Sequence, residues 1–249
     1  MELLNEKSKI IIVTGGSRGI GRGIVERLSN SGYTVILNYN ESEKEALDIQ
    51  KKLKKQNIEI DIYKADVSKR EQVIKLIKFV IEKYGKIDVL INNAGIDQVK
   101  MFTDITDEDW NSIINTNLTS VFYVTQETVK SMINRKQGCI INISSIWGII
   151  GASCESHYAI SKAGIDAMTK SLAKELGPSN IRINSIAPGI IDTDMNKNLT
   201  ENELNSIKDE IPLEKIGRPD DIAKCVEWLI NDTYTTGQII SINGGWNIN

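Results

Sequence analysis

The chain has 249 residues, of which 41% are hydrophobic and 25% are charged, the balance of an ordinary globular protein and not of a disordered one. The net charge of −3 excludes the strong basic field with which many proteins bind nucleic acid or anionic membranes, so we expect neither partner. The longest aliphatic run near the start, Ile10 to Val13, is too short to span a bilayer.

Cysteine and histidine usage limits the compartment and the chemistry. Residues 1–9 carry both signs of charge and no apolar stretch, so we expect no secretory leader. Cys139, Cys154 and Cys225 are scattered and odd in number, which favours reduced thiols in a cytoplasmic protein. His157 is the only histidine, which disfavours a Ser-His-Asp hydrolase and a histidine-rich metal site, and we expect no bound metal.

Short β-branched runs alternate with helical stretches along the chain. We expect strands at 10–14, 34–38, 58–64, 87–92, 139–144, 182–187 and 238–242. Between them we expect helices at 20–31, at 42–56, up to Tyr84, from Thr106 to Arg135, near 156–177 and near 219–230. A capping box of Ser68 and Glu71 opens the helix that ends at Tyr84, and Pro219 begins the last helix.

Strands that alternate with helices and are apolar throughout indicate a parallel sheet covered on both faces. With right-handed crossovers, seven such strands form a doubly wound α/β sheet. No linker or repeat divides the chain, so we expect a single domain over residues 1–249. Ligands of this architecture bind at the carboxyl ends of the strands, which is where we look for functional residues.

A glycine-rich turn follows the first strand, with glycines at 15, 19 and 21 in the spacing G-x-x-x-G-x-G. Gly15 permits the tight turn, Gly19 lets the backbone approach a diphosphate, and Gly21 lets the next helix pack closely. The free N–H groups at the start of that helix, around Ile20, suit a phosphate group. No Lys-Ser/Thr pair follows the last glycine, so the turn is not a P-loop.

The ends of the next strands point to the cofactor. The second strand ends in Asn38, Tyr39 and Asn40 without the acid that binds the ribose of NAD, and Ser17 and Arg18 can contact a 2′-phosphate, so we predict NADP(H). Asp66 and Val67 close the third strand, where an adenine amino group can be met. After the fourth strand the small residues Asn93, Ala94 and Gly95 leave room for a flat ring or a ribose.

Four polar residues suggest acid–base chemistry on a carbonyl group. Tyr158 and Lys162 lie four residues apart and share a helix face. A lysine ammonium one turn away, together with a nicotinamide charge, is expected to lower the pKa of the tyrosine hydroxyl from about 10. Ser145 follows a buried strand and can hydrogen-bond the carbonyl, and Asn117 can perturb its helix and hold a water that links Lys162 to solvent.

These residues, in this order, resemble the short-chain dehydrogenase/reductase family over essentially the whole chain. The resemblance rests on the glycine turn, Asn92-Asn93-Ala94-Gly95, Asn117, Ser145, Tyr158-x-x-x-Lys162 and Pro188-Gly189. It implies a Rossmann fold with strand order 3-2-1-4-5-6-7 and hydride transfer, with Tyr158 as acid–base, Lys162 on the nicotinamide ribose, Ser145 on the carbonyl and Asn117 in a proton relay. It also implies that Pro188, Gly189, Ile191 and Thr193 line the cofactor site.

Two branches of that family are similar to this chain. The segments around Ser145, Lys162, Pro188 and Gly244 resemble bacterial 3-oxoacyl-[acyl-carrier-protein] reductases, which implies a carrier-bound ketone and a carrier protein docked near the active-site mouth by basic residues such as Arg135 and Lys136. Trp147, Glu155 and the ending Gly244-Gly245-Trp246 resemble a related branch, some members of which reduce a 5-aminopentanone group on a modified lysine of elongation factor P. There Glu155 would face an amine. A third possibility is a scaffold that senses NADP(H) without turnover.

Two further expectations concern assembly and a lid. Apolar residues lie on more than one face of two helices; they are Ile113, Ile114, Val121, Phe122, Val124 and Val129 on the first, and Ile165, Met168, Leu172 and Leu176 on the second. A helix that is apolar on both sides buries its second face against a partner, and the family resemblance implies a homotetramer. The polar segment 192–210 is expected to be a mobile lid over cofactor and substrate.

Overall fold

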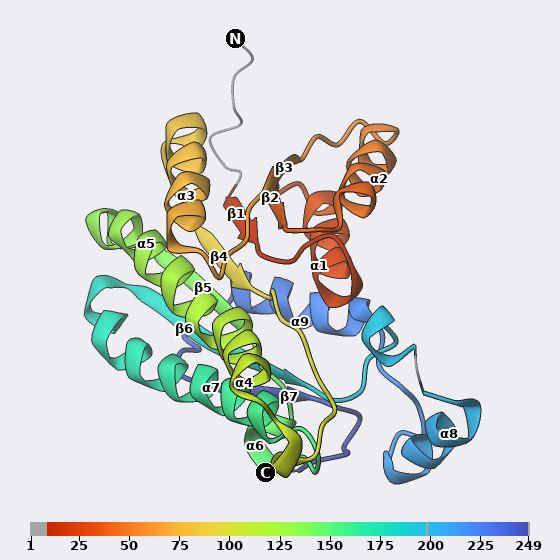
Figure 1. Ribbon diagram of the computed structural model, residues 1–249. Coiled ribbons are helices and arrows are strands. Elements are labelled where there is room, and N and C mark those ends of the chain that lie inside the picture. The colour runs from red at the N-terminus through yellow and green to blue at the C-terminus, as the bar shows by residue number, and fades with distance from the viewer. Residues whose placement is uncertain (1–8, 198, 249) are drawn as a thin grey trace.

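The computed structural model describes residues 9–197 and 199–248 and contains one parallel sheet of seven strands in the order β3-β2-β1-β4-β5-β6-β7 (Figure 1). The strands are β1 (Ile10–Val13), β2 (Thr34–Tyr39), β3 (Asp61–Lys64), β4 (Val89–Asn92), β5 (Gly138–Ile143), β6 (Ile181–Pro188) and β7 (Ile239–Ile242). The doubly wound α/β sheet and its strand order are therefore confirmed. The order reverses between β1 and β4, the place at which such sheets bind ligands.

Helices cover both faces of the sheet (Figure 1). Residues of α1 (Gly19–Asn30), α2 (Glu43–Lys54) and α9 (Pro219–Asn231) belong to one buried cluster. Residues of α3 (Arg70–Tyr84), α5 (Ser120–Arg135) and α7 (Ser156–Leu176) belong to another. The remaining helices are α4 (Asp107–Ile114), α6 (Trp147–Ile150) and α8 (Glu201–Glu210).

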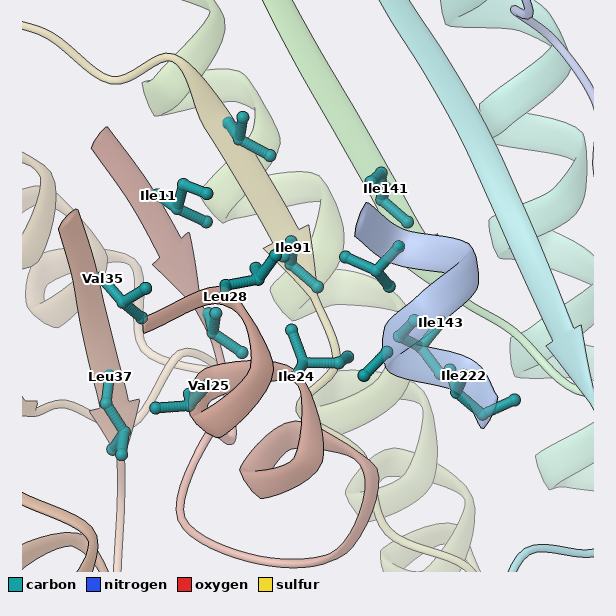
Figure 2. Close-up of a cluster of buried hydrophobic side chains, with 14 of the residues drawn as sticks. Ile11, Ile24, Val25, Leu28, Val35, Leu37, Ile91, Ile141, Ile143 and Ile222 are labelled. Carbon is teal, nitrogen blue, oxygen red and sulfur yellow. The ribbon is translucent and has the colours of Figure 1, made fainter. Parts of the chain in front are cut away.

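The alternation of side chains along each strand explains why both faces are buried. Ile11 and Val13 of β1 belong to the cluster on the α1 side, whereas Ile10 and Ile12 belong to the cluster on the α3 side. Figure 2 shows the first cluster, in which the apolar side chains of α1 point toward those of the strands. A strand that is buried on both faces must be apolar at every position, as the sequence of β1 is.

The long helix that was expected from Thr106 to Arg135 forms with an interruption. Thr106 and Asp109 make a capping box at its start, in which the Thr106 hydroxyl accepts from the Asp109 backbone N–H and the Asp109 carboxylate accepts from that of Thr106. Between α4 and α5 a π-helical turn, Asn115–Thr119, widens the helix. Asn117 lies inside this turn, so the expected perturbation of the helix at Asn117 is confirmed.

Two local predictions were wrong, and one further segment holds a helix that the sequence analysis did not predict. β3 begins at Asp61 and not at residue 58, because the ladder with β2 starts at the pair Ile36 and Asp61. Ser68 does not cap α3, because its hydroxyl and its backbone N–H both donate to Asp66, and the helix begins one residue later than expected. The segment 192–210 contains the helix α8, whose start carries a capping box of Thr200 and Glu203.

Hydropathy along the helices bears on membrane association. Within residues 9–197 and 199–248, no helix is both long enough and apolar enough to cross a membrane.

Candidate active site

The loops after β1 and β4 are joined by hydrogen bonds at the carboxyl edge of the sheet. The Thr14 hydroxyl accepts from the backbone N–H groups of Asn93 (2.9 Å) and Ala94 (3.1 Å). The Asn93 side-chain amide donates to the carbonyl oxygens of Thr14 and Gly15, at 3.0 and 2.9 Å. Asn93 therefore holds the two loops together, and Thr14, to which the sequence analysis gave no role, is its partner. The sequence feature that indicates a role for Thr14 is a polar residue directly after an apolar strand.

The glycine turn is shaped for a group that approaches the backbone. Gly15 and Gly19 have φ angles of +61° and +50°, which favour glycine. A Cβ at Gly21 would lie 2.2 Å from the Gly15 carbonyl oxygen, so the helix and the turn pack more closely than any other residue allows. No side chain caps the start of α1 and its first turn contains no acid, so its N–H groups are free to bind an anion.

A hollow of about 240 Å³ lies beside this turn. Its lining residues come from the glycine turn, α1, α2, the segment after β6 and the start of α9; they are Ser17, Arg18, Gly19, Arg22, Glu45, Asp192, Thr193, Asp194 and Pro219. Arg18 is exposed and makes no ion pair with a described residue, whereas Arg22 pairs with Glu26 at 2.9 Å. A free guanidinium beside uncapped N–H groups fits the phosphates of a dinucleotide.

Asn38, Tyr39 and Asn40 at the end of β2 are not among the residues that line this hollow. The Asn38 side chain is buried, and its amide lies within hydrogen-bonding distance of the carbonyl oxygens of Tyr39, Tyr63 and Ala65. Asn38 therefore ties β2 to β3, and the expectation that its side chain shapes a phosphate site is wrong. Asn40 is exposed at the strand end.

Other predicted cofactor residues divide into packing and turn positions. Val67 is buried, and Ile20 packs against the apolar cluster of α1. The Asp66 carboxylate accepts from the backbone and the hydroxyl of Ser68, which holds the turn after β3.

The segment after β6 is held close to the rest of the site. The Pro188 carbonyl accepts from the Ile146 N–H at 3.0 Å, which ties the end of β6 to the loop after β5. The Gly189 N–H donates to Ile242 at 3.0 Å, and Ile191 is buried. A Cβ at Gly19 would lie 3.3 Å from a methyl carbon of Thr193, so this segment covers the glycine turn.

Ser145, Tyr158 and Lys162 come together at the end of β5. All three side chains are buried, at 8, 9 and 4% exposure. Ser145 follows β5 and hydrogen-bonds the Tyr158 hydroxyl, and the Lys162 ammonium lies 5.5 Å from the centre of the Tyr158 ring. The Lys162 ammonium also donates to the Ile143 carbonyl at 3.0 Å. A tyrosine, a serine and a lysine in this arrangement can hold a carbonyl oxygen and give it a proton.

Burial changes the protonation of this group in a direction that the sequence analysis did not expect. It raises the pKa of Tyr158 well above 10, the Ser145 hydrogen bond opposes that rise, and the charges of Asp97 and Glu155 add to it. Burial also lowers the pKa of Lys162 to about 8, against the attraction of Asp166. Among the described residues burial therefore dominates, and the expectation that Lys162 and a nicotinamide charge together lower the pKa of Tyr158 stays a prediction.

Asn117 joins the loop after β4 to α7. Its side-chain oxygen accepts from the Ile96 N–H at 2.9 Å, and its amide donates to the Ile96 carbonyl at 2.8 Å and to the Ser161 hydroxyl at 3.2 Å. A Cβ at Gly95 would lie 3.3 Å from the Asn117 oxygen and 3.5 Å from the Lys162 nitrogen, so both side chains surround Gly95. The π-helical turn brings the Asn117 side chain to this position.

Two carboxylates lie near Tyr158. Asp97 is exposed, yet the protein around it removes enough water to raise its pKa. Burial raises the pKa of Glu155, and the negative charge of Asp97 adds to the rise. Neither makes an ion pair with a described residue. The sequence analysis gave Asp97 no role, because only the fold brings it near Glu155.

Aromatic residues connect the same region to α8. The rings of Trp147 and Trp246 meet edge to face with their centres 5.2 Å apart. The backbone N–H of Trp147 donates to the Ser145 hydroxyl at 3.2 Å, and the indole N–H of Trp246 donates to Glu210 of α8 at 3.2 Å. Contacts through the two tryptophans therefore link Ser145 to α8.

Arg135 and Lys136 do not lie at this mouth. They precede β5, whereas Ser145 follows it, so they occupy the opposite edge of the sheet. Arg135 binds the Asp88 carboxylate at 2.7 Å and also donates to the Ile87 carbonyl. The prediction that Arg135 and Lys136 lie near the active-site mouth is therefore wrong for the active site of the same chain.

Together, the doubly wound sheet, the glycine turn and the polar cluster define an enzyme of the dinucleotide-binding α/β class. A family model described as short chain dehydrogenase matches residues 9–204. The chain is 40% identical over 242 residues to the 3-oxoacyl-[acyl-carrier-protein] reductase FabG of Thermotoga maritima, an alignment that covers 96% of this chain and 98% of that protein. It is 39% identical over 239 residues to the protein of the same name from Buchnera aphidicola, covering 95% and 96%.

The protein of the same name from Chlamydia trachomatis is 40% identical over 240 residues, which cover 96% of this chain and 97% of that protein. The chain therefore belongs to the short chain dehydrogenase family. It is an oxidoreductase that acts on a carbonyl or hydroxyl group with a nicotinamide cofactor, so the expected family and enzyme class are confirmed.

Proposed function

We propose that the protein is an NADPH-dependent reductase of 3-oxoacyl thioesters carried on acyl carrier protein. The observation that carries the proposal is the buried cluster of Ser145, Tyr158 and Lys162 beside an uncapped glycine turn, in a chain that aligns end to end with relatives of that name. The bound nicotinamide supplies the hydride to the ketone carbon. The protein supplies position and a proton.

Each member of the cluster has one task in this proposal. Ser145 and Tyr158 hydrogen-bond the ketone oxygen, and Tyr158 gives that oxygen its proton. The raised pKa of Tyr158 keeps the hydroxyl protonated at neutral pH, as a proton donor for reduction requires. Lys162 is charged below a pH of about 8 and binds the nicotinamide ribose. Asn117 holds the loop that carries Gly95 and connects Lys162 to a proton relay.

The preference for NADPH over NADH is part of the proposal. Arg18 is exposed, makes no ion pair with a described residue and lines the hollow, so it can bind a 2′-phosphate. The end of β2 offers Tyr39 and Asn40 and no carboxylate that would repel the phosphate. Around this site, residues 192–210 form a substrate lid within a single domain, and the enzyme works as a cytoplasmic homotetramer.

A second candidate reaction is favoured by the carboxylates near Tyr158. Asp97 and Glu155 have no cationic partner among the described residues, and burial disfavours their charged forms. A ketone that carries an ammonium group would relieve both effects, as the 5-aminopentanone group on a modified lysine of elongation factor P would. Under this alternative the same Tyr158 cluster reduces a different ketone.

Oxidation of NADPH by two matched ketones separates the candidates. An acetoacetyl thioester and a small amino-ketone are compared at equal concentration, with wild type and Glu155→Gln. The proposed function predicts that the thioester is the better substrate and that Glu155→Gln changes its kcat/KM little. If the amino-ketone has the higher kcat/KM and that value falls in Glu155→Gln, the result would support the second candidate. No turnover of any ketone would contradict both.

A further inference from the structure

His157 is the only histidine of the chain, and it precedes Tyr158 in α7. Its side chain is fully buried, at 0% exposure. The Nε2 atom lies 2.9 Å from Oε1 of Gln98, in the loop that follows β4. This hydrogen bond therefore joins the helix that carries Tyr158 to a loop 59 residues earlier in the chain.

The partners of Gln98 determine where the histidine proton lies. The Gln98 amide nitrogen donates to one oxygen of Asp109 at 2.7 Å, and the Lys100 ammonium binds the other. These bonds and those from Thr106 hold the pKa of Asp109 far below its ordinary value, so the carboxylate is ionised and only accepts. Gln98 must then present its NH₂ to Asp109 and its oxygen to His157, and His157 must donate from Nε2.

The other ring nitrogen fixes the charge of His157. Nδ1 is buried and has no hydrogen-bond partner among residues 9–197 and 199–248. A neutral ring leaves only a lone pair there, whereas a protonated ring would bury an unsatisfied N–H. Burial accordingly lowers the pKa of His157; Asp109 opposes this and Lys100 adds to it. The ring is thus a neutral donor at physiological pH.

Within the loop between β4 and α4, the segment 96–98 is held at both of its ends by side chains of the site. Ile96 is bound through both its backbone groups by Asn117, and Gln98 is bound by His157. Asp97, between them, is close enough to raise the pKa of Tyr158 by its charge. A hollow of about 340 Å³, lined in part by Ile96 and Gln98, adjoins the loop, so packing alone does not fix its position.

We propose that His157 is a positioning residue of the ketone site, which holds residues 96–98 against Tyr158 through its Nε2 hydrogen bond with Gln98. The inference deepens the proposed ketone reduction and depends on it only for the kinetic test. Without the bond, the loop keeps its attachments to Asn117 and, through Gln98 and Lys100, to Asp109, but it loses the direct bond from Gln98 to α7 that fixes the distance of Asp97 and Ile96 from Tyr158.

The histidine tautomer provides a test that does not depend on activity. In tag-free protein labelled with ¹⁵N-histidine, the single imidazole gives one pair of ring-nitrogen signals, so no assignment is needed. We expect a protonated Nε2 and a bare Nδ1 at neutral pH. Gln98→Leu should shift the ring toward a mixture of tautomers. An Nδ1-protonated ring in wild type, or an unchanged ring in Gln98→Leu, would overturn the inference.

Two substitutions of His157 separate the hydrogen bond from the volume of the ring. His157→Phe keeps a ring and removes the donor, and we expect a fall in kcat of about 10-fold or more with an unchanged Kd for NADPH, since small displacements of reacting groups have effects of that size. His157→Gln supplies a neutral N–H donor and should restore most of the loss. A melting temperature measured for each variant separates loss of fold from loss of position.

The pH profile adds a readout that a purely structural role would not move. Protonation of His157 at Nδ1 leaves the Nε2 donor but buries an unsatisfied N–H, which should displace the ring and lower kcat as the pH falls through the lowered histidine pKa. His157→Gln should lack that limb. Asp97, Glu155 and Asp109 are present in both proteins, so only the limb that disappears reports on His157. Wild-type turnover together with wild-type kinetics in His157→Phe would overturn the inference and leave the proposed function intact. A wild type without turnover would contradict the proposed function instead.

Discussion

At the scale of single residues, burial is the strongest influence on the candidate site. Tyr158 and Lys162 are both buried, and loss of water moves each toward its neutral form: the pKa of the tyrosine rises and that of the lysine falls to about 8. At neutral pH the hydroxyl therefore holds its proton while the ammonium keeps its charge.

Tyr158→Phe removes the proton donor and nothing else from the cluster. We expect kcat to fall by about 10²–10⁴-fold, the usual contribution of general acid–base catalysis, with NADPH binding nearly intact because the glycine turn and Lys162 remain. Steady-state kinetics and a fluorescence titration of NADPH check the two halves. Tyr234→Phe, at a side chain that is 93% exposed, is the matched control. Retention of more than a few per cent of kcat would remove Tyr158 from this role.

The lowered pKa of Lys162 predicts how kcat changes at alkaline pH. Its pKa is lowered from 10.5 to about 8, so the charge is present below that pH and is lost as the pH rises through it. In the proposed mechanism the charged Lys162 binds the nicotinamide ribose, so kcat should decline above a pH of about 8. Initial rates across the neutral and alkaline range measure this, and a profile that stays flat to about 10, where free lysine titrates, would contradict it.

Asn38 illustrates how far residue-level prediction from sequence reaches. An asparagine at the end of β2 was consistent with a preference for NADP(H), but its side chain contacts three carbonyl groups of β2, β3 and the turn that follows. Asp97 and Thr14 were not assigned roles, because their partners lie on other loops. Residues within one motif were predictable, whereas contacts between loops depend on the fold.

The cofactor preference is therefore tested at Arg18. Arg18→Ala should raise the KM for NADPH by about 10–100-fold, the equivalent of one charge-assisted contact, and leave the KM for NADH unchanged. Arg22→Ala is the matched control, since Arg22 lines the same hollow but pairs with Glu26. Equal KM effects on both cofactors would contradict the assignment of Arg18.

Asn38→Asp, in contrast, places a carboxylate against carbonyl oxygens and should lower the free energy of unfolding by about 3 kcal/mol in a urea titration.

At the scale of elements, periodicity predicted the strands and helices of the sheet, and failed where short-range polar contacts decide the structure. The Thr106 capping box was predictable because both of its partners lie within four residues. Ser68 offered the same pattern but binds Asp66, which competes for its hydroxyl. The helix α8 was missed because the segment 192–210 is polar, although Thr200 and Glu203 form a capping box at its start.

The position of α8 allows the lid prediction to specify where a protease cleaves within residues 192–210. Trypsin cleaves after Lys197, which is exposed before the helix, and after Lys208, which lies inside it. Because a protease needs an extended backbone, we expect cleavage at Lys197 to be the faster. Saturating NADPH should slow it, since Thr193 covers the glycine turn. Mass spectrometry of timed digests identifies the site; faster cleavage at Lys208, or a rate indifferent to NADPH, would contradict the lid.

At the scale of the whole molecule, the topology followed from the order of the elements, and assembly is the property left to test. Some of the apolar residues on these helices face the core of the chain, because Ile113, Val121, Val124 and Ile165 are all buried. Other positions stay open: Phe122, one of the residues named from the sequence, is 43% exposed on α5, and Ile160 is 46% exposed on α7. A partner subunit would cover these exposed positions, and the assembly stays a prediction.

We predict a homotetramer that is held in part by the exposed faces of α5 and α7. Phe122 is stacked under Arg70, whose guanidinium lies 5.6 Å from the ring centre, so the ring is presented rigidly. Phe122→Asp would bury an unpaired charge in such an interface and should shift the light-scattering mass below that of a tetramer. Ile74→Asp, at a side chain with 44% exposure on α3, is the matched control and should not change the mass. A wild-type protein that is a monodisperse monomer would contradict the assembly outright. A tetramer unaffected by Phe122→Asp would instead move the interface away from α5.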